Sequence, residues 1–142
     1  MSAPTPFQGD KIYVLIDLIF FLSGYAMMLT MFSALTDEGY KNAVAQGQQV
    51  TLAQVQGVTM GIVGCTAVLC APINIVFWIN MIKGKKWSLI AMIVLVAAGL
   101  LLSIPRISGP MMAWTIFSII VSMVKLVYLS MRVAKKFGPD LI

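Results

Sequence analysis

The stretch Ile12–Leu35, IYVLIDLIFFLSGYAMMLTMFSAL, holds 24 residues and a single charged side chain, Asp17. A run of about 20 apolar residues crosses the hydrocarbon core of a bilayer as a helix. A carboxylate inside such a run costs roughly 2.5–3.5 kcal/mol on insertion scales. The stretch therefore predicts a membrane-spanning helix in which Asp17 needs a partner.

Composition points the same way for the whole chain. Of its 142 residues, 60% are hydrophobic and 11% are charged, whereas soluble domains have about 45–50% and about 25%. A water-soluble fold of this size could not bury so much apolar surface, whereas a lipid bilayer solvates it. The net charge of +5 does not predict nucleic acid as a partner, because the basic residues stand at the ends of apolar runs.

Four apolar runs predict an all-α membrane bundle of four helices with short loops, at about residues 12–35, 52–82, 87–104 and 111–131. Residues 1–11 are expected to be a non-helical cytoplasmic lead-in without the features of a signal peptide. A polar loop is expected after the first helix. Residues 132–142 form a basic tail.

Capping residues support two of the helix starts. Thr51 and Gln54 have the spacing of a capping box, and Ser108 is the expected N-cap of the fourth helix. The second run, about 32 residues and about 48 Å long, exceeds the bilayer core of about 30 Å. Its first turns are expected to stand outside the membrane, or the helix is expected to tilt.

The distribution of lysine and arginine predicts the orientation. With the N-terminus in the cytoplasm, Lys41 and Arg106 lie outside, and both termini lie inside. Lys11 and the predicted membrane-interface residues share the inner side; the latter are Lys83, Lys85, Lys86, Arg132, Lys135 and Lys136. The expected location is the plasma membrane, the inner membrane of a bacterium.

Asp17, Lys125 and Asn74 are predicted to form a polar layer within the membrane. Asp17 follows the inner end of the first helix by about 7–8 Å, and Lys125 precedes the inner end of the fourth by about 9 Å. An ion pair between them would be structural, or it would couple a proton or cation to transport. Alternatively, Lys125 extends to the lipid head groups and never meets Asp17.

Gly57, Gly61, Gly64 and Cys65 form a ridge of small residues along one face of the second predicted helix. Such a ridge allows another helix to approach closely. The other helix belongs either to the same chain or to another subunit, and the sequence leaves both open. Cys65 and Cys70 are five residues apart on a helix and point to different sides, so no disulfide is expected between them.

No feature predicts an enzyme, a metal site or a cofactor. The chain has no histidine, and no nucleophile stands beside a base. The spacing of Met27 and Met31 resembles that in the pore helices of high-affinity copper importers. Those proteins have three spans and methionine-rich outer tails, so flexible core filling is the better account of the methionines here.

These observations predict a small non-enzymatic membrane protein that packs against copies of itself or against other membrane subunits. Its loops are too short to form a soluble functional domain. The first alternative is a small ion- or proton-coupled transporter or channel that uses Asp17 and Lys125. A second alternative is an immunity or exclusion factor against membrane-active toxins, for which the sequence contains no specific feature.

Overall fold

The structure, a computed structural model, describes residues 7–142 apart from positions 108, 110 and 137. The described part is all-α, as predicted, and four of its helices are long and apolar enough to cross a membrane. In chain order the elements are α1 (Gln8–Thr30), α2 (Phe32–Ala45), α3 (Leu52–Ile82), α4 (Lys86–Ser103), the 3-10 turn η1 (Ile104–Arg106) and α5 (Met112–Val133). The proposed cap Ser108 and the first six residues lie outside the described residues.

The first helix differs from its prediction at both ends. It begins at Gln8, inside the expected lead-in, and it stops at Thr30 rather than Leu35. Met31 (φ −99°, ψ 13°) leaves the helical conformation, and the chain restarts as α2. The expected polar loop is therefore largely helical. Its mixture of apolar and charged residues suits a helix that covers a neighbour with one face.

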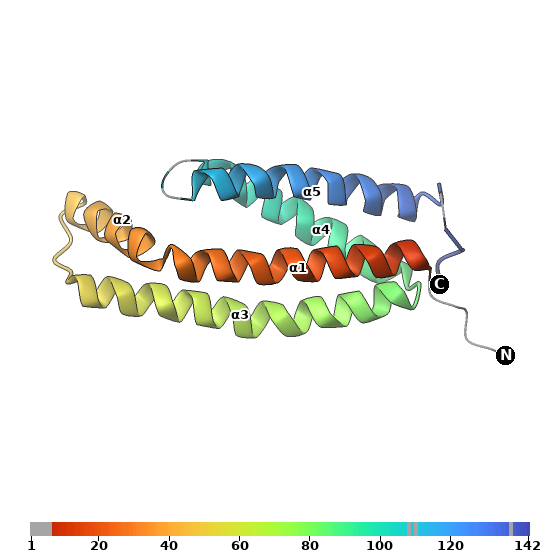
Figure 1. The fold of residues 1–142 in the computed structure, drawn as a ribbon, viewed down its shortest axis with the longest axis horizontal. Helices are drawn as coiled ribbons and strands as arrows, with labels where there is room; N and C mark the ends of the chain where they lie inside the picture. Colours follow the sequence, from red (N-terminus) through yellow and green to blue (C-terminus); the bar gives the residue numbers. More distant parts are fainter. Residues whose placement is uncertain (1–6, 108, 110, 137) are drawn as a thin grey trace.

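Helix α2 covers the first turns of α3 (Figure 1). A Cβ atom at Gly39 of α2 would lie 3.3 Å from Cγ1 of Val55, so the glycine permits a close approach. The predicted capping box of α3 is confirmed: the Thr51 N–H donates to Gln54 Oε1 at 2.8 Å, and the Gln54 N–H donates to Thr51 Oγ1 at 3.3 Å. With 31 residues, α3 is about 46 Å long, and its start projects with α2 beyond the α4–α5 turn (Figure 1).

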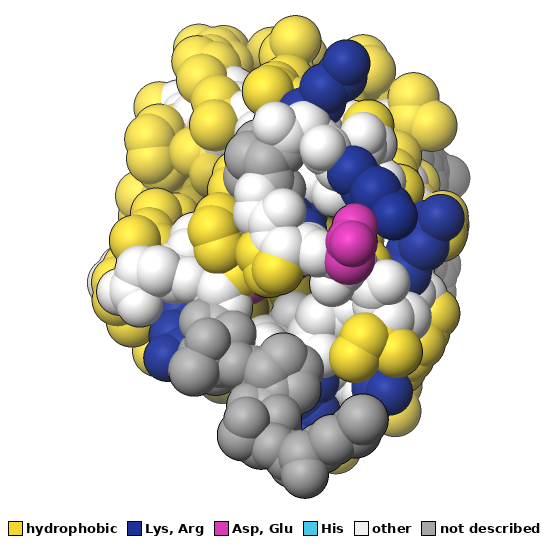
Figure 2. Space-filling view, turned by 90° about the vertical axis from the view of Figure 1, so that its right-hand side faces the viewer, with side chains coloured by type: hydrophobic (Ala, Val, Ile, Leu, Met, Phe, Trp, Pro, Cys, Tyr) yellow, Lys and Arg dark blue, Asp and Glu magenta, His cyan; other side chains and the backbone are white. Residues whose placement is uncertain are grey.

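The packed core lies near one end of the bundle, at the α3–α4 turn. The buried apolar side chains are Tyr13, Trp78, Met81, Leu89, Met92 and Leu129. The C-terminal residues cover the same turn, since the Ile142 N–H donates to Gly84 O and the Lys86 N–H donates to Ile142 O, both at 2.8 Å. We call this the basic end, defined by residues 83–86 and 132–142, and Figure 2 shows its Lys and Arg side chains.

Helix α1 stands apart from α4 and α5. Among the described residues, no Cα atom of α1 lies within 8 Å of a Cα atom of α4 or α5, whereas α4 and α5 pack closely together and α3 contacts both α1 and α4. The space between α1 and the α4–α5 hairpin is bridged only by side chains. These side chains include most of the charged residues that lie inside the bundle.

Candidate functional site: a cavity between α1 and the α4–α5 hairpin

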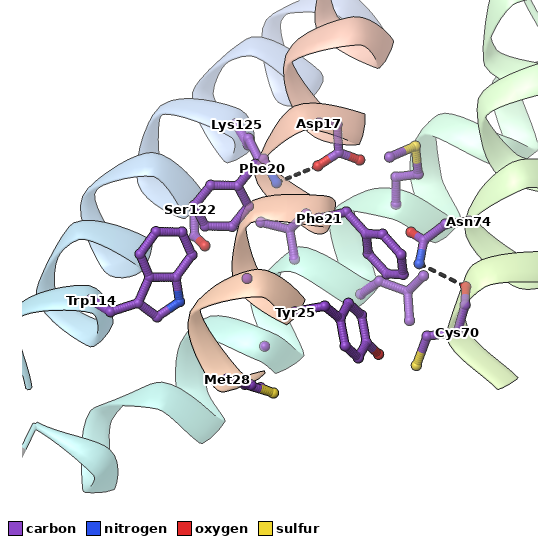
Figure 3. A pocket seen from close by; sticks show the side chains of 15 residues that line it. Asp17, Phe20, Phe21, Tyr25, Met28, Cys70, Asn74, Trp114, Ser122 and Lys125 are labelled. Carbon is purple, nitrogen blue, oxygen red and sulfur yellow. Dashed lines mark hydrogen bonds and ion pairs between the residues drawn. The ribbon is translucent and has the colours of Figure 1, made fainter. Parts of the chain in front are cut away.

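Asp17 and Lys125 form an ion pair between α1 and α5 (Figure 3). Their side chains are 9% and 11% exposed. The second carboxylate oxygen of Asp17 accepts a hydrogen bond from Nε1 of Trp78 at 2.7 Å, and the Lys125 ammonium lies 4.5 Å from the centroid of the Phe20 ring. The alternative in which Lys125 extends away from Asp17 is therefore wrong. Whether the pair is structural or couples transport stays a prediction.

Asn74, the third member of the predicted polar layer, does not join the pair. Its Nδ2 donates to the carbonyl of Cys70 in its own helix at 2.8 Å. Both residues line the same cavity as Asp17 and Lys125 (Figure 3). Asn74 therefore adds polarity to the cavity wall without binding either charge.

The cavity has a volume of about 370 Å³ and takes walls from α1, α3, α4 and α5. Along α1 its lining runs from Asp17 to Met28, which is about 16 Å of helix. Gly99 of α4 and Trp114 of α5 line it near the end opposite the basic end. The ion pair and the packed core thus close one end of an elongated cavity, and most of the cavity wall is apolar.

A second ion pair, Asp10–Arg132, lies closer to the basic end, and sequence reasoning missed it. Both side chains are 1% exposed, and Nη2 of Arg132 lies 3.1 Å from Asp10 Oδ2. The Tyr128 hydroxyl donates to Asp10 Oδ1 at 2.9 Å, and Nη1 of Arg132 donates to the carbonyl of Pro139 at 2.7 Å. This network buries Arg132 among protein side chains, and its position at the membrane interface stays a prediction.

The two pairs repeat at one spacing. Asp10 and Asp17 are seven residues apart on α1, and Lys125 and Arg132 are seven residues apart on α5. Seven residues are nearly two full turns, so each pair of like charges lies on one face of its helix. Because the helices run in opposite directions, the first acid meets the last base and the second acid meets the earlier base. We call this arrangement the charge ladder.

Two stacked tyrosines lie between the rungs of the charge ladder. The ring centroids of Tyr13 and Tyr128 are 5.1 Å apart, at an interplanar angle of 14°. The Tyr13 hydroxyl is buried and has no hydrogen-bond partner among the described residues, whereas that of Tyr128 donates to Asp10. Aromatic packing and ion pairs together join α1 to α5 where their backbones do not meet.

The other predicted interface residues stay at the surface of the basic end. Lys83, Lys86, Lys135 and Lys136 are exposed, and Lys85 is half-buried. Lys135 forms an exposed ion pair with Asp140 at 3.1 Å. Such a distribution of lysines suits the boundary between lipid head groups and water.

The small-residue ridge faces out of the bundle. Gly57, Gly61, Gly64 and Cys65 are all exposed, and a Cβ atom at any of the three glycines would meet nothing within 4 Å. The alternative in which the ridge packs a helix of the same chain is therefore wrong for the described residues. Around the ridge the surface is apolar: Val58 is 63% exposed and Val68 is 73% exposed.

No group of three or more His, Cys, Asp or Glu side chains with metal-binding geometry occurs among the described residues. Cys65 and Cys70 are both free thiols. The polar groups of the site are one neutralised charge pair, an amide and hydroxyls in an apolar wall. Comparison of the chain with protein families, curated proteins and solved structures found no match.

Proposed function

We propose that the protein is a non-enzymatic membrane component that associates with a second copy of itself through the small-residue ridge of α3. The observation that carries this proposal is the exposure of Gly57, Gly61 and Gly64 with empty space above them. In a bilayer, apolar side chains gain little by leaving lipid, so helices associate where small residues let their backbones approach. Within the described residues, no other helix packs against this face of α3.

Self-association is favoured over a different partner by the direction of the helices. Every copy has the same distribution of Lys and Arg, which sets the orientation in the membrane. Two copies therefore insert in the same orientation, and their α3 helices would run parallel. Parallel pairs with two glycines four residues apart are a recurrent geometry for helix dimers in membranes. Docking onto other membrane subunits is the alternative use of the same ridge.

Cys65 is expected to crosslink two copies through a disulfide. It lies one turn after Gly61 on the ridge and is exposed, so in a parallel pair the two Cys65 side chains face each other. Mild oxidation of native membranes should give a dimer on a non-reducing gel. The crosslink should persist in Cys70→Ser, because the half-buried Cys70 lies off the ridge, and it should vanish in Cys65→Ser.

Gly61→Leu should reduce the crosslinked fraction at least fivefold, since its side chain would hold the two backbones apart. Gly99→Leu is the matched control, because it adds the same side chain to an open glycine on another helix. A crosslink that survives Gly61→Leu, or native masses that show only monomers in mild detergent, would contradict the proposal. Crosslinking of Cys65 to another protein would favour the hetero-subunit alternative.

The proposed orientation places the basic end in the cytoplasm of a bacterial cell, with both termini inside. A single cysteine can report it in a background in which Cys65 and Cys70 are replaced by serine. Asp37→Cys on α2 should react with a membrane-impermeant maleimide in intact spheroplasts. Lys85→Cys at the α3–α4 turn should react only after permeabilisation. Equal labelling of both positions from one side would overturn the four-span topology.

A small ion- or proton-coupled transporter or channel is the second candidate. It is favoured by the cavity that ends on the Asp17–Lys125 pair inside the bundle. Charged residues within membrane helices are rare and frequently mark ion or substrate pathways. The packed core of the basic end would have to open in such a mechanism.

A further inference from the structure

The cavity between α1 and the α4–α5 hairpin has the dimensions of a small-molecule site. Its volume of about 370 Å³ lies within the range of about 300–1,000 Å³ found for ligand pockets. The α1 backbone stays away from α4 and α5 over the whole space. Ligand pockets are mostly apolar, with a few polar groups that orient the ligand. This cavity likewise has a mostly apolar wall and a few polar side chains.

Aromatic side chains form part of the cavity wall, and two glycines line it without a side chain. The Phe20 and Trp114 rings stack across the α1–α5 boundary, with centroids 5.5 Å apart and an interplanar angle of 15°. Tyr25 comes from the next turn of α1 (Figure 3). Gly24 and Gly99 expose backbone to the cavity, and a Cβ atom at Gly99 would meet nothing within 4 Å. A planar ring matches such walls, since aromatic faces stack favourably.

The polar end of the cavity carries donors and no net charge. The Lys125 ammonium has three N–H donors, and the Asp17 carboxylate neutralises its charge. Ser122 lies three residues before Lys125 on α5, one turn away, and lines the same cavity. A free anion would meet the Asp17 carboxylate and a free cation the Lys125 ammonium. A neutral group with a hydrogen-bond acceptor is repelled by neither the Asp17 carboxylate nor the Lys125 ammonium.

We propose that this cavity binds a neutral, membrane-soluble compound with a planar ring and a carbonyl acceptor, the chemistry of a quinone head group. The ring would lie against the stacked Phe20 and Trp114 rings, and its carbonyl oxygen would accept a hydrogen bond from the Lys125 ammonium. An apolar tail would leave along the part of the cavity remote from the basic end. This inference is independent of the pairing of α3 helices, and the two fail separately.

Binding can be measured with a decyl-substituted benzoquinone added to the purified protein in nanodiscs. The chain has three tryptophans. Trp114 lines the cavity, and Trp87 is 49% exposed on the α3–α4 side. In the Trp87→Phe protein we expect saturable quenching of tryptophan fluorescence at low quinone-to-lipid ratios. Quenching that rises linearly without saturation would overturn the proposal.

Variants locate the site and test its chemistry. Gly99→Leu should fill the cavity and weaken binding at least tenfold, whereas Ala98→Leu, at the adjacent exposed position, should leave it unchanged. The double variant Asp17→Asn/Lys125→Met removes the Lys125 ammonium without leaving a lone charge, and it should also weaken binding at least tenfold. If Gly99→Leu and Asp17→Asn/Lys125→Met both bind the quinone with the affinity of the parent protein, and their melting temperatures are unchanged, the proposal is overturned.

The carbonyl requirement has its own comparison. Decylbenzene has the same tail and a ring of the same size, and it lacks the oxygen atoms. Measured as displacement of a radiolabelled decyl-substituted benzoquinone, decylbenzene should compete at least tenfold less well than a nonyl-substituted benzoquinone. Equal displacement by decylbenzene would show a site for any apolar chain and would overturn the assignment of the ligand class.

Discussion

Arg132→Met is expected to lower the free energy of unfolding by about 3–5 kcal/mol. The substitution leaves the Asp10 carboxylate, which is 1% exposed, without its cation, and removal of one partner of a buried ion pair has a cost of about this size. It also removes the hydrogen bond from Arg132 to the Pro139 carbonyl. Unfolding in mixed micelles with increasing SDS, followed by circular dichroism, measures the change.

The double variant Asp10→Asn/Arg132→Met should recover most of this loss, because it leaves no buried charge unpaired. The stacked tyrosines supply a matched control. Tyr128→Phe removes a hydrogen bond to a charged group, worth about 1.5–3 kcal/mol, whereas Tyr13→Phe removes a buried hydroxyl without a described partner and should not destabilise. A stable Arg132→Met protein would show that Asp10 is not buried as described.

Lys125→Met is expected to lower the free energy of unfolding by about 3 kcal/mol. It leaves Asp17 inside the apolar part of α1, where a charge alone is costly. Among the described residues, the Trp78 N–H is then its one hydrogen-bond donor. If the pair is structural, Asp17→Asn/Lys125→Met should restore the stability of the parent within about 1 kcal/mol. SDS-induced unfolding measures the free energy of unfolding of both variants.

Measurement of ion-coupled uptake distinguishes a structural role of the Asp17–Lys125 pair from a role in transport. In proteoliposomes, a transporter that uses Asp17 would lose ion-coupled uptake in Asp17→Asn while remaining folded. The Asp17→Asn/Lys125→Met protein would then be stable and inactive. Uptake that is indistinguishable between the parent and this double variant would exclude the coupling role and leave the pair as a structural bridge between α1 and α5.

The sequence predicted those features that depend on local composition. The four apolar helices follow from run lengths, and the depth match of Asp17 with Lys125 follows from 1.5 Å of rise per residue. The capping box follows from the three-residue spacing of Thr51 and Gln54. The boundaries of α1 did not follow. Its first turn is polar, and at Met31 the chain leaves the helix without a proline or glycine. The sequence predicted a loop in place of helix α2, because the apolar face of α2 is stabilised by its contact with α3 and local sequence does not reveal that contact.

The features that depend on which helix faces meet could not be predicted in the same way. Asp10 and Arg132 were assigned to two separate polar ends, although their seven-residue distances from Asp17 and Lys125 carried a signal that could have identified the second ion pair. The outward direction of the ridge at Gly61 and the space beside Gly99 depend on the positions of all the helices. No local pattern specifies them.

The charge ladder has a consequence for assembly in the membrane. Because the charges of both helices are spaced seven residues apart, a slip of α5 by seven residues along its axis would still form one pair, and it would leave one acid and one base unpaired. A slip of seven residues in either direction therefore loses one of the two ion pairs, and the register in which both pairs form is favoured. The charge ladder thereby specifies the register of α1 against α5, whose apolar side chains alone would specify it less well.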